Sequence, residues 1–153
     1  MKNLIVFLFI GITAIGTSGC SVSKRLAPFT ETLAAAANSN QSAEQKLEIL
    51  AVTTTRALSE SLVFANPKKT VQFVSAFTRK NEQSILKIVN DINGNVSTMS
   101  LTEKVGFYAN TAQKPYIREL KSEVKTVEKR VGRKIKTFGV LGNFMNVLNP
   151  LKK

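Results

Sequence analysis

Several residue types that commonly carry chemistry are scarce or absent in this chain. Among its 153 residues there is no histidine, no tryptophan and a single cysteine. Without an imidazole, the chain lacks the side chain that most often binds metals or transfers protons near neutral pH. One cysteine excludes an intramolecular disulfide, because that bond needs two thiols. We therefore expect no metal site and no cofactor.

Acidic residues are also few. The chain has 10 Asp and Glu against 22 Lys and Arg, which gives a formal net charge of +12. The imbalance is concentrated near the end, because residues 112–153 contain eleven basic and three acidic residues. A hydrophobic content of 43% is enough for a folded core and too high for a wholly disordered chain. The length allows one small domain at most.

The first 19 residues have the layout of a secretory signal peptide. Lys2 supplies a positive start, the apolar stretch 4–16 follows, and small residues lead up to Cys20. A helix that spans a bilayer needs about 20 apolar residues, so this stretch is short for a permanent anchor. An uncleaved anchor is the least favoured of the alternatives.

Thr17-Ser18-Gly19-Cys20 resembles the lipobox of bacterial lipoproteins, although Thr17 stands where an apolar residue is usual. The resemblance covers only the first 21 residues. It implies cleavage before Cys20 and acyl chains such as palmitate on this cysteine, which would anchor the protein in a membrane. Ser21 in place of Asp implies the outer membrane of the bacterial cell envelope. The alternative is an ordinary secreted or periplasmic helical protein without lipid.

Residues 20–41 show no strong apolar period around Pro28, and they predict a flexible tether after the lipidated cysteine. The ends of such a chain would lie about 25 Å apart. Residues 30–37 could form a short helix, because Thr30 can cap it and alanines favour it. We thus expect residues 42–153 to form the folded part.

In that part, apolar residues three and four apart predict an all-α bundle of about four helices. The first begins with a capping box of Ser42 and Gln45 and ends before Pro67. A second apolar face extends over residues 71–92. Asn81 interrupts this face either as a buried polar residue or as a break between two helices.

A turn is predicted at residues 93–95, where Gly94 lies between two asparagines. Ser100 and Glu103 form a second capping box and start a short helix with its apolar face at Leu101, Val105 and Tyr108. Pro115 suits the first turn of the last long helix. Its apolar face comprises Ile117, Leu120, Val124, Val127, Val131, Ile135 and Phe138.

The same helix, residues 114–136, carries a second face that is basic. This pattern indicates either a solvated surface or a binding surface for an anionic lipid, an envelope polymer or an acidic protein. Nucleic acid is not expected after an export signal. The basic face comprises Lys114, Arg118, Lys121, Lys125, Lys129, Arg133 and Lys136.

The apolar residues 138–148 have two interpretations. They either pack across the other helices and complete the core, which we favour, or insert into a bilayer after the basic face has docked.

Catalysis finds little support in the sequence. Ser122 and Lys125 have the Ser-x-x-Lys spacing of some serine hydrolases, but the other motifs of those enzymes are missing. We therefore expect a binding or scaffolding protein and not an enzyme.

Overall fold

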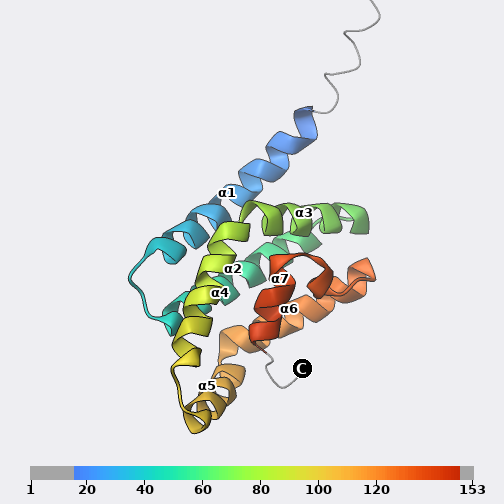
Figure 1. Cartoon of the computed structure of the whole chain (residues 1–153). Helices are drawn as coiled ribbons and strands as arrows, with labels where there is room; N and C mark the ends of the chain where they lie inside the picture. Colours follow the sequence, from blue (N-terminus) through green and yellow to red (C-terminus); the bar gives the residue numbers. More distant parts are fainter. Residues whose placement is uncertain (1–15, 149–153) are drawn as a thin grey trace, which may run out of the picture.

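The computed structural model describes residues 16–148 and the side chains of residues 22–148 (Figure 1). Residues 1–15 of the predicted signal peptide and the side chain of Cys20 lie outside this part. The all-α prediction is confirmed for the described residues, but the expected number of about four helices is wrong. Seven α-helices and one 3-10 turn occur: α1 (Gly16–Asn38), α2 (Ala43–Leu62), α3 (Pro67–Lys80), α4 (Glu82–Ser97), α5 (Leu101–Gln113), α6 (Pro115–Val131), η2 (Ile135–Thr137) and α7 (Val140–Val147).

Helix α2 lies at the centre and packs against α1, α3, α4 and α6. Its predicted capping box is present, with the Ser42 hydroxyl accepting from the backbone N–H of Gln45. Leu47, Leu50 and Leu58 point into the core. Helix α2 also contains a buried lysine, Lys46, which is tolerated because its ammonium group pairs with the only aspartate, Asp91 of α4.

The expected tether is instead helical, because residues 22–38 belong to α1. Leu26 and Leu33 are buried against α2 and α4, and Val22 and Phe29 pack at the edge of the same core. These side chains are three and four residues apart, so they share one face of the helix. Pro28 lies on the exposed side, where its missing N–H removes one backbone hydrogen bond but leaves the helix continuous and this packing intact.

Asn81 separates α3 from α4 and is also completely buried, so both interpretations of this residue apply. The side-chain NH₂ of Asn81 donates to the backbone carbonyl of Phe77 at 2.8 Å, and the backbone carbonyl of Asn81 accepts from the N–H of Ile85 at 2.9 Å. A single asparagine thereby ends one helix and begins the next, which lets α4 leave α3 at an angle (Figure 1).

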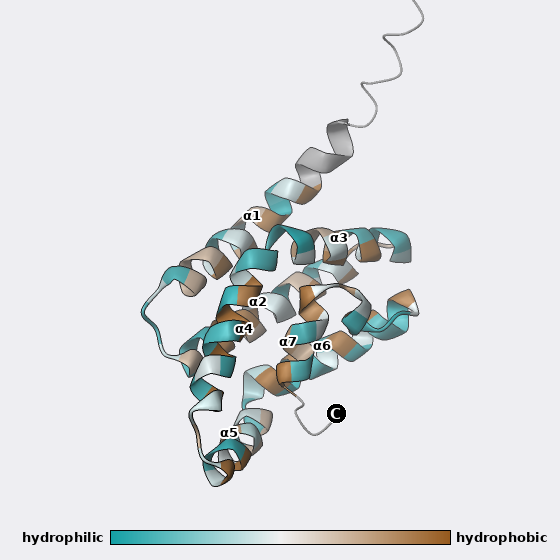
Figure 2. Ribbon diagram, viewed as in Figure 1, coloured by the Kyte–Doolittle hydropathy of each residue, from teal (hydrophilic) through white to brown (hydrophobic). Residues whose placement is uncertain are grey.

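The turn predicted after Asn81 is wrong. Residues 93–95 continue α4, because burial of Ile92 and Val96 keeps its last turn helical despite the central glycine. The short helix predicted after Ser100 is present as α5 with its capping box. Its apolar face is largely uncovered, because Leu101 is 79% exposed and Val105 is 62% exposed. Helix α5 packs mainly on α6 and projects from one end of the molecule (Figures 1 and 2).

The last long helix is shorter than expected, because α6 ends at Val131 and Gly132 adopts a left-handed conformation with φ of 66°. Glycine is the residue that accepts this conformation at a helix end without strain. The chain then returns through η2, and α7 packs on α4. Leu141 and Phe144 are completely buried, which confirms the core interpretation of the described C-terminal residues. Insertion into a bilayer would require them to leave this core.

Candidate anion-binding surface

Helix α6 presents its two predicted faces to different surroundings. Pro115 occupies the first turn, as expected, and Ile117, Leu120 and Val127 are completely buried against the core. On a helical projection, Lys125 lies about 125° and Lys121 about 85° from this apolar face. The core contacts of α6 therefore leave most of its basic side in solvent.

The predicted basic residues do not all share one helix face. Arg118, Lys121, Lys125 and Lys129 lie on α6, and we call these four the α6 basic surface. Arg133 follows the left-handed Gly132, and Lys136 lies in η2, so the expectation of one continuous helix over residues 114–136 is wrong beyond Val131. Six of the seven predicted residues are exposed, and Lys121 is partly buried.

None of these seven basic residues forms an ion pair with another residue of the range 22–148. The three ion pairs in that range are Arg25–Glu60, Lys46–Asp91 and Lys134–Glu128. On α6 itself, Glu119 and Glu123 lie about 120° and 160° around the helix from Lys125, and Glu128 is paired with Lys134, so none of the three neutralises the basic side. The α6 basic surface is thus a row of uncompensated positive charges.

A shallow depression of about 330 Å³ lies at the C-terminal end of α6. Lys125, Lys129 and Arg133 line it together with Glu128 and Lys134. The Glu128 carboxylate is already engaged, because it accepts from the backbone N–H of Ile135 at 2.8 Å and pairs with Lys134 at 3.2 Å. Three unpaired cations therefore remain around the depression, which suits an anionic group.

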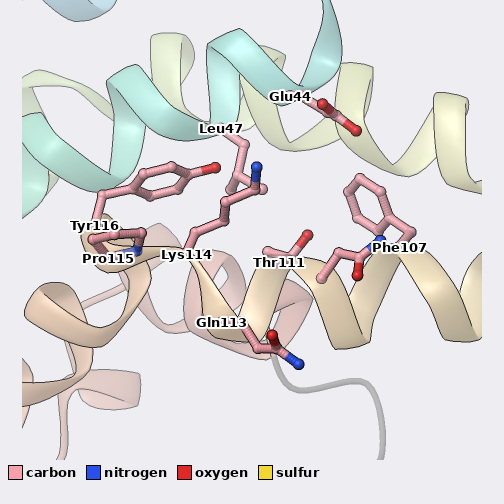
Figure 3. A pocket seen from close by; sticks show the side chains of 9 residues that line it. Glu44, Leu47, Phe107, Thr111, Gln113, Lys114, Pro115 and Tyr116 are labelled. Atoms are coloured by element: carbon pink, nitrogen blue, oxygen red, sulfur yellow. The ribbon is translucent and has the colours of Figure 1, made fainter.

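Lys114 lies elsewhere, in a pocket of about 360 Å³ between α2, α5 and α6 (Figure 3). Figure 3 shows Lys114 and Tyr116 extending toward α2, where Glu44 lies on the opposite wall. Burial raises the pKa of the Tyr116 hydroxyl, and the carboxylates of Glu48 and Glu44 raise this pKa further. Lys114 thus shares its pocket with the acidic Glu44 and with no other cation, so this pocket does not extend the α6 basic surface.

A second basic surface, on α3, was missed by the sequence reasoning. Helix α3 contains Lys68, Lys69, Arg79 and Lys80 and no acidic residue. All four are exposed, and none is in an ion pair with another residue of the described range. We call these four the α3 basic surface. The signal that could have revealed it is the complete lack of acid over residues 67–80, which the larger charge of the last third obscured.

Other kinds of site find no counterpart in the described residues. Ser122 and Lys125 are both exposed on α6. Residues 16–148 contain no group of three potential metal-binding side chains. None of the described helices is both long enough and apolar enough to cross a bilayer. Comparisons with known protein families, with curated protein sequences and with solved structures found no match.

Proposed function

We propose that this protein is a lipid-anchored component of the bacterial cell envelope, held in the outer membrane, and that it acts as a binding or scaffolding module. The lipid would be attached to Cys20, and the α6 basic surface would bind an anionic envelope polymer or an acidic protein. The single observation that carries the binding proposal is the row of basic side chains on α6, exposed except for the partly buried Lys121, without acidic partners in the described range.

The spacing of these charges supports a partner. Lys121, Lys125 and Lys129 follow one another at intervals of four residues, so their ammonium groups repel along the helix. Each such pair costs about 0.2–0.5 kcal/mol in an isolated helix. An anionic partner would turn this cost into a favourable interaction, because each lysine could then face a negative group.

Reversal of three charges tests the binding proposal. The variant Lys121→Glu, Lys125→Glu, Lys129→Glu should elute from an immobilised polyanion, heparin, at a much lower salt concentration than the unchanged chain. A matched control, Arg56→Glu, Lys87→Glu, Lys104→Glu, makes the same change in net charge on other helices. If both variants lose binding equally, net charge rather than the α6 basic surface is responsible, and the proposal is wrong.

Mass spectrometry tests the anchor separately. The N-terminal peptide from the membrane fraction should begin at Cys20 and carry the added mass of acyl chains. A peptide that begins at another residue, or an unmodified Cys20, would contradict the lipid anchor and favour an ordinary secreted or periplasmic protein.

A further inference from the structure

The continuity of α1 determines how near the membrane a lipid on Cys20 would hold the folded part. Cys20 and Leu26 belong to the same helix, and Leu26 is buried in the core. Six residues of α-helix span about 9 Å, whereas the expected flexible tether would have extended about 25 Å. The anchored end of α1 therefore keeps the helices that surround it close to the bilayer surface.

Helix α3 is one of those neighbouring helices. It contacts α1, and the Lys80 ammonium group lies 3.5 Å from the hydroxyl of Ser23, three residues after Cys20. Figure 1 shows α3 toward the end of the molecule from which α1 extends, with α5 at the opposite end. A bilayer that holds Cys20 would accordingly meet α3 before α5.

The chemistry of α3 suits an anionic surface. The α3 basic surface occupies both ends of the helix, which are hydrophilic in Figure 2, and the exposed positions between them hold Gln72 and Ser75. Its large apolar residues, Phe73 and Phe77, are buried in the core. Contact through this face would consequently be electrostatic and would not require insertion into the hydrocarbon layer.

Nearby acidic residues leave most of this charge uncompensated. Glu60 of α2 is already paired with Arg25 of α1. Glu82, the first residue of α4, is exposed next to the last turn of α3 and is a single charge against four. Lys24 of α1, which follows Ser23 in the chain and is also exposed, adds a further positive charge.

From these observations we propose that the α3 basic surface docks on the anionic phospholipid headgroups of the same membrane that holds the lipid on Cys20. This inference rests on the proposed lipid anchor. Together, the lipid on Cys20 and the docking of α3 would orient the protein, with α3 against the membrane and α5 directed away from it. Basic residues near a membrane surface are attracted by anionic lipids, and salt weakens that attraction.

The lone cysteine makes a direct test possible, because lipidation blocks its thiol and leaves any new cysteine as the only labelling site. Lipidated protein that begins at Cys20, with Ser75→Cys on α3 or with Thr102→Cys on α5, is labelled with a fluorophore. It is then reconstituted into phosphatidylcholine vesicles with or without phosphatidylglycerol. With phosphatidylglycerol, the Ser75→Cys label should be quenched several-fold less by a water-soluble quencher than the Thr102→Cys label. High salt or pure phosphatidylcholine should remove the difference. Equal quenching of the two labels in every vesicle would overturn docking through α3.

Charge variants then separate the α3 and α6 basic surfaces. Lys68→Glu, Lys69→Glu, Arg79→Glu should expose the Ser75→Cys label, whereas the matched variant Lys121→Glu, Lys125→Glu, Lys129→Glu should leave it protected. The reverse result would assign membrane docking to α6 and overturn the proposal. Vesicle flotation distinguishes the two levels of failure. Protein that does not float with vesicles lacks the lipid anchor, and then the anchor proposal and the α3 docking proposal both fail. Protein that floats but has an unprotected label refutes only the docking through α3.

Discussion

Helices α5 and α7 both lie at the edge of the fold, but different interactions hold them there. Helix α5 has 13 residues and begins with a complete capping box, yet Thr111 is its only buried residue. Helix α7 has 8 residues and no side-chain cap, yet Leu141, Gly142 and Phe144 are buried. One helix has strong local signals and little burial, and the other has the reverse.

The difference indicates how each helix should respond to mutation. A helix of eight residues is too short to be stable alone in water, so α7 depends on its contacts with the core. Helix α5 packs mainly against α6, so it can open without disrupting α2 and its neighbours. We therefore expect changes in α7 to lower the free energy of unfolding of the whole protein, and changes in α5 to act locally.

The largest effect is expected for Phe144→Ala. Phe144 is completely buried, and removing its ring would leave a cavity in the core between α7 and α4. Such a substitution costs about 3–5 kcal/mol, measured as the free energy of unfolding in denaturant. The matched control is Phe107→Ala on α5, where the ring is partly exposed and the loss should be clearly smaller. Similar losses for both variants would contradict the distinction between the two helices.

Two glycines allow the next comparison, with effects of opposite sign. A Cβ atom on Gly142 of α7 would lie 2.6 Å from the Cα and 2.7 Å from the carbonyl oxygen of Lys136. Gly142→Ala should therefore separate α7 from η2 and cost about 1–3 kcal/mol of unfolding free energy. A Cβ on Gly106 of α5 meets no atom within 4 Å. Gly106→Ala should stabilise its helix by about 0.5–1 kcal/mol, and thermal melting of both variants checks the two signs.

The sequence was sufficient where a signal is local. Capping boxes at Ser42 and Ser100 and the proline at the start of α6 are visible as short patterns, because the interacting groups are three residues apart or less. The apolar residues on the buried face of α1 have the same spacing as those of the other helices. Pro28 lies among them, however, and the alanines that follow make the buried and exposed faces differ little in hydrophobicity. Burial against α2 and α4 decides the helix there, and no local pattern reports that burial.

The α6 and α3 basic surfaces differ in the same way, because a local pattern reveals the first and a tertiary contact gives the second its importance. The basic residues of α6 could be found from their spacing, because it is a property of one helix. The importance of α3 depends on its contact with α1, as seen between Lys80 and Ser23, which are 57 residues apart in the chain. The exposed apolar residues of α5 show the same limit, because a helical period shows that a face exists but not whether another helix covers it.

The capping box of α5 should have a moderate effect that is confined to that helix. Ser100→Ala removes the acceptor for the N–H of Glu103 and should cost about 1 kcal/mol of helix stability. Hydrogen exchange of α5 amides should accelerate while the exchange of α2 amides stays unchanged.

Lowering the pH should destabilise α5 in the same direction as Ser100→Ala. Hydrogen bonds from Ser100 lower the pKa of the Glu103 carboxyl below its ordinary value of 4.5, so the folded helix favours the ionised form. This contribution is complete above the ordinary pKa and is lost as the pH falls through the lowered pKa. Glu103→Gln should remove this pH dependence of α5 hydrogen exchange, because an amide does not titrate in this range. The same acid-induced loss of protection in the Glu103→Gln variant would contradict the assigned role of the carboxylate.

The smallest effect is expected at the exposed apolar face of α5. Leu101 is 79% exposed, so Leu101→Gln should change the free energy of unfolding by no more than about 0.5 kcal/mol. Leu141→Gln on α7 is the matched control, because Leu141 is completely buried and its replacement would place an amide in the core. Denaturant titrations at low and high protein concentration complete the comparison. A concentration-dependent loss for Leu101→Gln would mean that a second chain covers α5, and the two helices would then differ in their partner rather than in their degree of burial.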